Sequence, residues 1–129
     1  NYAYSLLKQY KGEWEFDTNW KMIFGHPKKA GWIKAIQEAQ QTVQKGLKLD
    51  CPILVMSSNK SFPETETWHE EYMTSDIVLD VQDIQKYGEK LGDKVTRDTI
   101  PNGIHDLILS QKPYRNDAYQ TIFEWLKKQ

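Results

Sequence analysis

The chain of 129 residues is long enough for one domain with a hydrophobic core. Its 17 basic and 18 acidic side chains leave a formal net charge of −1 at pH 7, which favours neither nucleic acid nor an anionic membrane surface as a partner. Hydrophobic and aromatic residues make up 39% and 12% of the chain, as in a folded globular protein, and no apolar run approaches the ~20 residues of a membrane span, so we expect no stable membrane insertion.

The first 31 residues are irregular and rich in aromatic side chains. Glycine and proline recur among the aromatic residues, and the apolar residues show neither a long helical periodicity nor the alternation of a strand. Residues 4–7 (YSLL) are compatible with the end of a helix. Regular secondary structure is expected to begin at Trp32.

A helical stripe opens the regular part of the chain. Apolar residues recur at i, i+4, i+7 and i+11 from Trp32, and Gly46 follows as a stop signal. The apolar run 52–56 has the length and the branched side chains of a fully buried strand in a parallel sheet. Residues 57–75 are polar and contain a proline, which predicts a long loop. A brief apolar stretch, 76–79, follows it.

The same alternation of strand and helix continues to the end of the chain. A helix is expected over about residues 81–91, a strand over 95–100 and a last helix over about 114–127. The order strand–helix–strand implies parallel pairing through a right-handed crossover, so the predicted fold class is α/β. Two parallel strands alone would leave both sheet edges exposed, which predicts that further strands complete the sheet. The last helix has one apolar face, made by Tyr119, Ile122, Phe123 and Leu126.

Two polar segments follow the two predicted strands. Functional groups of an open α/β sheet gather at the carboxyl ends of its strands, so Asp76 and His105 are expected on the same rim. That is the arrangement of a Ser–His–acid triad, in which the carboxylate orients the imidazole and the imidazole acts as general base. The acid also precedes the histidine in the chain, as it does in α/β-hydrolases.

Three segments resemble α/β-hydrolases of the serine aminopeptidase and lysophospholipase type. Residues 51–56 (CPILVM) are similar to the strand that precedes the acid loop in that family. Residues 75–80 (SDIVLD) are similar to the segment whose first Asp is the triad acid, and residues 102–107 (NGIHDL) to the segment whose His is the base. The helix that ends with residues 123–126 (FEWL) also fits.

The resemblance implies a fold, an activity and two site residues. Residues 32–129 would be the C-terminal portion of an α/β-hydrolase fold, and residues 1–31 would belong to its cap or lid. Asp76 would be the acid and His105 the base of a serine hydrolase that acts on a carboxylic ester, a lysophospholipid or a small peptide. No cofactor is implied, since triad chemistry needs none.

Two further acids stay open as the triad acid. Residues 58–75 form a longer insertion before Asp76 than many relatives have, which leaves Asp80 and Asp83 as alternatives. Asp106, next to His105, is poorly placed to hold the imidazole of its neighbour and is expected to be structural.

The nucleophile is not among these residues. A nucleophile elbow has the pattern Gly-x-Ser-x-Gly, and no serine of the chain has glycine at both positions. We therefore expect an N-terminal half of the same hydrolase to supply the serine and the oxyanion hole, either upstream on one polypeptide or as the other piece of a nicked enzyme. A small ester or amide is then the expected substrate. The alternative is a non-catalytic α/β interaction module or pseudo-hydrolase, and a homo-oligomer is left open.

Other candidate residues have simpler interpretations. Cys51 is predicted to be a small buried side chain. A single cysteine and no signal-like segment predict a cytoplasmic protein. Residues 69–71 (HEE) lack the second histidine of a zinc motif, so no metal site is predicted. Three residues of the long loop either line a substrate pocket or pack the loop down: Trp68, Tyr72 and Met73.

Overall fold

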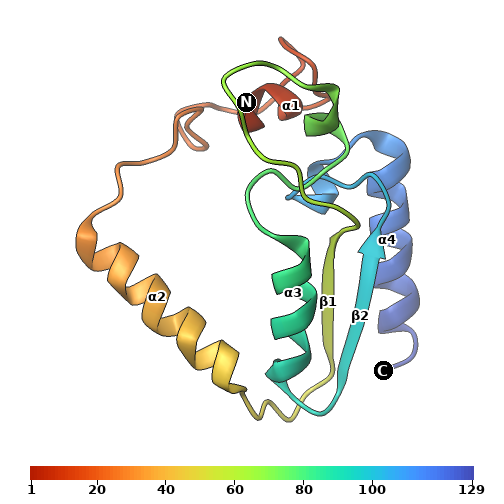
Figure 1. The fold of residues 1–129 in the computed structure, drawn as a ribbon. Helices are drawn as coiled ribbons and strands as arrows, with labels where there is room; N and C mark the ends of the chain where they lie inside the picture. The colour runs from red at the N-terminus through yellow and green to blue at the C-terminus, as the bar shows by residue number, and fades with distance from the viewer.

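The computed structural model describes residues 1–129 and has a mixed α/β architecture (Figure 1). Three short 3₁₀ helices accompany the main elements, at Glu70–Met73, Glu89–Leu91 and Leu107–Leu109. The α/β class and the order of helices and strands expected from residue 32 onward are confirmed. The main elements in chain order are α1 (Tyr2–Leu6), α2 (Ala30–Lys45), β1 (Ile53–Ser58), α3 (Val81–Gly88), β2 (Val95–Ile100) and α4 (Lys112–Leu126).

The two strands form a parallel sheet. Ile53 lies opposite Val95, and the register runs without a break to Ser58 opposite Ile100. No further strand joins the sheet, so each strand has one outer edge without a strand partner. The prediction that the first strand is fully buried is therefore wrong for residues 53–56, which are only half-buried because a neighbour covers them on one edge.

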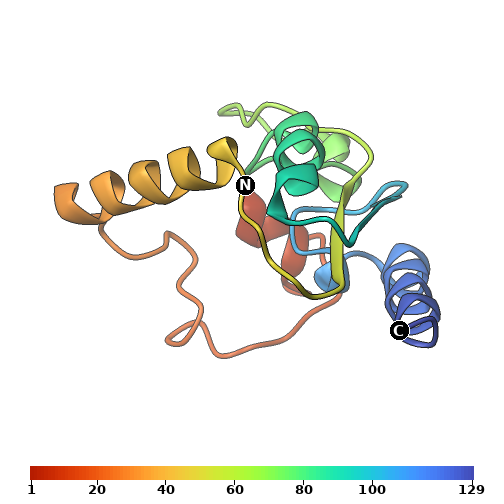
Figure 2. The same ribbon diagram turned by 90° about the horizontal axis from the view of Figure 1, so that it is seen from below.

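Helices α3 and α4 lie on opposite sides of the strands (Figures 1 and 2). Helix α3 packs directly on β1 through Gly88, where an added Cβ atom would lie 2.8 Å from Cγ1 of Val55. Helix α4 packs on β2, and the indole of Trp125 donates a hydrogen bond of 3.2 Å to Thr96 Oγ1. The chain thus makes one strand–helix–strand unit with a helix on each face.

Two predicted apolar faces do not meet a core. Helix α2 diverges from the sheet (Figure 1). It has no buried residue, and Trp32 near its start is 53% exposed. On α4, Phe123 and Leu126 are 57% and 52% exposed. The helical periodicity is confirmed for both, and these apolar side chains are largely exposed because no other part of the chain covers them.

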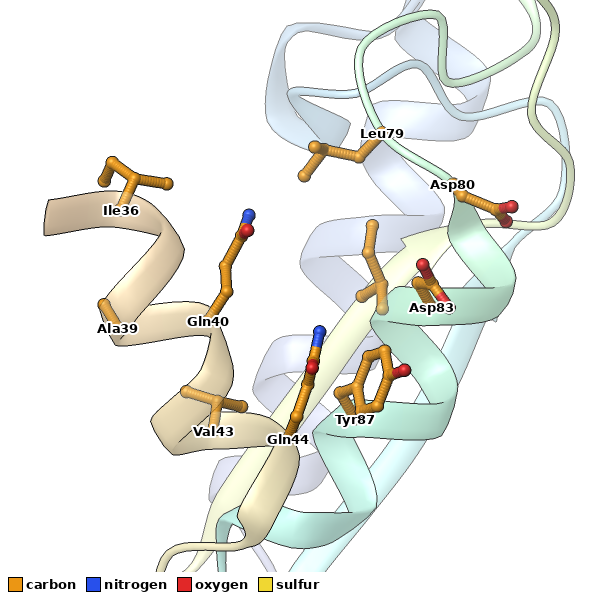
Figure 3. Close-up of a pocket in the computed structure, with 10 residues that line it drawn as sticks. Ile36, Ala39, Gln40, Val43, Gln44, Leu79, Asp80, Asp83 and Tyr87 are labelled. Carbon is orange, nitrogen blue, oxygen red and sulfur yellow. The ribbon is translucent and has the colours of Figure 1, made fainter. Parts of the chain in front are cut away.

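An open groove of about 380 Å³ separates α2 from α3 (Figure 3). Helix α2 contributes Ile36 and Val43 to one wall, and Ile84 and Tyr87 of α3 form the facing wall. At its C-terminal end α2 contacts the 3₁₀ helix that follows α3, where Lys90 donates a hydrogen bond of 2.8 Å to the carbonyl of Gln44. The stripe predicted on the first helix therefore faces a groove.

Most of the buried apolar residues belong to segments near the carboxyl ends of the strands, and the exceptions are Val81 of α3 and Ala118 of α4. The others come from the end of α1 and the residue after it, from the first 3₁₀ helix, and from the end of β2 and the loop that follows. Tyr72 and Met73 are among them, so these two side chains pack the long loop down. The other members are Leu6, Leu7, Ile100 and Ile104.

The N-terminal segment has a packed part and an exposed part. The indole of Trp14 donates a hydrogen bond of 2.8 Å to the carbonyl of Leu109, and Glu13 accepts one of 3.0 Å from the backbone of Lys112. By contrast, Trp20 and Phe24 are 88% and 94% exposed. The division of the chain at residue 31 stays a prediction.

The single cysteine does not lie in the core. Cys51 is exposed, which corrects the expectation of a buried side chain. The reason is that β1 begins only at Ile53, so Cys51 belongs to the connection at the amino end of the strand, away from the buried cluster. No helix of the structure has both the length and the apolar character that crossing a membrane requires.

Candidate catalytic dyad

Asp76 is held at the base of the long loop after β1. Its backbone N–H donates to the carbonyl of Lys60 at 3.0 Å, and its carbonyl accepts from the N–H of Phe62 at 2.9 Å. These two bonds make a short parallel bridge between Ser61 and Asp76. The loop therefore returns to its own starting point, and the acid stands just beyond the carboxyl end of the strand.

The Asp76 carboxylate is buried and has three N–H donors. Oδ1 accepts from the backbone N–H groups of Val78 and Leu79, at 2.8 and 2.9 Å. Oδ2 lies 2.9 Å from Nδ1 of His105. The residue is only 1% exposed, so these donors replace the water that an ionised carboxylate would otherwise need.

His105 is placed by a tight turn after β2. The N–H of Gly103 closes the turn on the carbonyl of Ile100 at 3.0 Å, and Asn102 adopts a left-handed φ of 59°, which asparagine tolerates better than most residues. The backbone N–H of Ile104 then donates to Ser110 Oγ at 3.0 Å. The two residues that precede His105 are thus anchored by their own hydrogen bonds, which positions the imidazole beside Asp76.

The ionisation of the two groups is coupled. Burial raises the pKa of the Asp76 carboxyl, but the hydrogen bonds from His105, Leu79 and Val78 outweigh it and leave the pKa below its ordinary value. The hydrogen bond to Asp76 raises the pKa of His105 above its ordinary value, against an opposing effect of burial. The pair therefore favours an ionised carboxylate beside an imidazole that holds a proton readily.

The second imidazole nitrogen of His105 is unoccupied. Nδ1 is engaged by Asp76, Nε2 makes no hydrogen bond within the chain, and the side chain is 28% exposed. An imidazole fixed in this way presents Nε2 as the acceptor for a proton from an outside group. The dyad can thus serve as an oriented general base.

The alternative acids have other partners. Asp80 caps α3, with its carboxylate accepting the N–H of Gln82 at 2.8 Å. Asp83 lies in the first turn of the same helix and lines the groove that faces α2 (Figure 3). Among the three acids, Asp76 alone contacts His105.

Residues from the far end of the chain surround the dyad, and these were not foreseen. The carboxylate of Asp106 accepts hydrogen bonds from the Tyr2 hydroxyl at 2.6 Å and from Lys21 Nζ at 2.8 Å. The structural role expected for Asp106 agrees with these contacts. Neither Tyr2 nor Lys21 carries a local sequence signal, because the partner of each lies more than 80 positions away.

The histidine of the HEE segment has a local role. His69 Nε2 lies 3.2 Å from Thr67 Oγ1, and its ring packs against Phe62 and Tyr72. No group of three or more His, Cys, Asp or Glu side chains is arranged to hold a metal ion. The candidate site therefore consists of Asp76, His105 and the residues that hold them.

Comparisons of the chain with protein-family models, curated proteins and solved structures found no match. Function is therefore inferred from the geometry around Asp76 and His105.

Proposed function

We propose that this chain is the C-terminal portion of an α/β-hydrolase and carries the acid, Asp76, and the base, His105, of a Ser–His–Asp triad. The whole enzyme would hydrolyse a carboxylic ester, a lysophospholipid-like ester or a small peptide. One observation carries the proposal: the 2.9 Å contact between Asp76 Oδ2 and His105 Nδ1, which leaves Nε2 free.

In this proposal the chain's own residues move the protons of acyl transfer. His105 Nε2 takes the hydroxyl proton as the serine oxygen attacks the substrate carbonyl, and then donates it to the leaving oxygen or nitrogen. Water repeats the sequence to release the acid and restore the serine. Asp76 stays ionised and stabilises the imidazolium, which its three N–H donors and its low pKa favour.

The arrangement of elements around the dyad supports the same proposal. The acid follows β1 and the histidine follows β2, so both lie at the carboxyl ends of neighbouring parallel strands. A helix covers each face of the sheet, as in doubly wound α/β folds (Figure 2). The unpaired strand edges and the exposed apolar faces of α2 and α4 are what a larger sheet with further helices would cover.

The alternative is a non-catalytic α/β module. It is favoured by the absence of the Gly-x-Ser-x-Gly pattern and by the fact that no serine of the chain hydrogen-bonds to His105. In such a module the buried ion pair would serve only to hold two loops together.

Labelling with a fluorophosphonate probe separates the two functions. The probe attaches covalently to a serine activated by a triad, so the full-length protein should label and His105→Ala should abolish labelling. His26→Ala is the matched control, because His26 lies in the exposed N-terminal segment, and it should label like the wild type. Retained labelling in His105→Ala would refute the assignment of the base, and a wild type that does not label would favour the non-catalytic module.

A further inference from the structure

The N-terminal helix reaches the loop that carries the base. The hydroxyl of Tyr2 donates to Asp106 Oδ2 at 2.6 Å and accepts from the Asp106 backbone N–H at 3.1 Å. A single phenol thus holds both the side chain and the peptide group of the residue that follows His105. Because two hydrogen bonds converge on one oxygen, the position of this peptide is fixed relative to α1.

The ring of Tyr2 also contacts the imidazole itself. The two ring centroids lie 6.1 Å apart with an interplanar angle of 74°, an edge-to-face arrangement. His105 therefore has Asp76 at Nδ1 and an aromatic ring at its side. A histidine ring rotates broadly about its second side-chain torsion unless neighbours restrict it, so the Tyr2 ring narrows the orientations available.

Lys21 completes the arrangement. Its ammonium group lies 2.8 Å from Asp106 Oδ2 and 5.7 Å from the centroid of the Tyr2 ring. Burial and the neighbouring Asp106 raise the pKa of Tyr2, so the phenol remains a donor. The charged groups that act on His105 are Asp76, Asp106 and Lys21.

We propose that Tyr2 is a positioning residue for His105. Its hydroxyl fixes the Asp106 peptide and its ring limits rotation of the imidazole, so that Nδ1 stays on Asp76 and Nε2 stays directed outward. An effect of Tyr2 on catalysis rests on the proposed hydrolase function. The geometric claim about the imidazole can be tested without any activity.

The first test replaces Tyr2 by phenylalanine, which keeps the ring and removes both hydrogen bonds. NMR of the protein follows the Nδ1–H proton of His105 and the two imidazole nitrogens. Loss of the fixed peptide should let this proton exchange with solvent about tenfold faster, the factor expected for losing hydrogen bonds to a charged group. Tyr4→Phe is the matched control on the same helix: the Tyr4 ring packs on Tyr10 and its hydroxyl makes no hydrogen bond, so exchange should stay unchanged.

A second variant tests whether Tyr2 acts through Asp106. Asp106→Ala removes the carboxylate partner and should also speed exchange of the Nδ1–H proton. In the double variant the two effects should combine to less than their product, because both substitutions remove the hydrogen bond between the Tyr2 hydroxyl and the Asp106 carboxylate. Exchange in Tyr2→Phe that matches the wild type, or effects of the two variants that simply multiply, would overturn the proposal.

Labelling of the full-length protein keeps the two proposals apart. Tyr2→Phe should label about tenfold more slowly than the wild type, with Tyr4→Phe unchanged. If His105→Ala still labels while Tyr2→Phe speeds proton exchange, the hydrolase function fails and the positioning of the imidazole stands. If His105→Ala abolishes labelling while Tyr2→Phe changes neither readout, the positioning proposal fails and the hydrolase function stands.

Discussion

Replacing Asp76 by asparagine tests the electrostatic interaction between Asp76 and His105. The amide oxygen can keep the hydrogen bonds from the backbone N–H groups of Val78 and Leu79, so the local turn is preserved. At the position of Oδ2, however, an acceptor with negative charge becomes an NH₂ donor facing His105 Nδ1. The pKa of His105 should therefore fall below its wild-type value, and the neutral imidazole should carry its proton on Nε2.

The effect on stability should depend on pH in a defined direction. Because the pKa of His105 is raised in the folded state, its contribution to stability is fully present below the unfolded-state pKa of about 6.5 and is lost as pH rises through the folded-state pKa. Because the pKa of Asp76 is lowered, its contribution is present above about 3.9 and is lost as pH falls through the folded-state value. The ion pair thus contributes most between about pH 3.9 and 6.5.

The loss of unfolding free energy in the Asp76→Asn variant should therefore be larger near pH 5.5 than near pH 8.5. Near pH 5.5 the Asp76→Asn variant loses a charge-assisted hydrogen bond and places two donors face to face, which should cost about 2–3 kcal/mol. Near pH 8.5 the neutral imidazole of His105 can accept from the amide, so the cost should fall to about 1 kcal/mol or less. For a chain of this length these values correspond to roughly 6–15 °C and roughly 3–5 °C in Tm.

Two measurements check this reasoning. NMR titration of the His105 ring in the wild type and in the variant gives the change in its pKa. Urea unfolding at the two pH values gives the loss of free energy. An unchanged pKa of His105, or a stability loss that is equal at both pH values, would refute the coupling described here.

Three other substitutions have expected outcomes. Gly88→Ala should destabilise the protein by about 1–3 kcal/mol in urea unfolding, because its Cβ atom would lie 2.8 Å from Cγ1 of Val55, and a cost near zero would show that α3 can shift. Asp80→Ala should cost about 1 kcal/mol by removing the N-cap of α3, yet leave the pKa of His105 unchanged in the NMR titration, whereas a lowered pKa would bring Asp80 back as the acid. Ser75→Ala should be neutral or stabilising by up to about 1 kcal/mol in thermal unfolding, because the buried Oγ has no partner to lose, and clear destabilisation would reveal a missed hydrogen bond.

Local spacing made the strand–helix–strand unit predictable. The apolar residues of a strand or helix lie close together in sequence, so their period identifies the element whatever it packs against. The parallel order then places the ends of the two strands on one rim, which is why Asp76 and His105 could be expected to meet.

Contacts that depend on distant residues could not be predicted. Tyr2 meets Asp106 across 104 positions, and no periodicity or motif links the two. For a related reason, the sequence could not show whether the apolar faces of α2 and α4 are buried. An apolar face indicates that a helix packs against another surface, but not whether that surface belongs to the same chain. Cys51 was wrongly predicted to be buried because it stands beside an apolar strand in the sequence, whereas the adjoining strand residues 53–56 are themselves only half-buried.

The bridge between Ser61 and Asp76 fixes the position of the acid independently of the residues in the loop between them. Because the segment is closed at its base, residues can be added or removed at its tip while the carboxylate stays where it is. The entropic cost of a longer closed loop grows only slowly with its length. The exposed residues 63–67 at the tip can therefore change in length without displacing the acid, whereas the buried Tyr72 and Met73 nearer the bridge hold the loop in place.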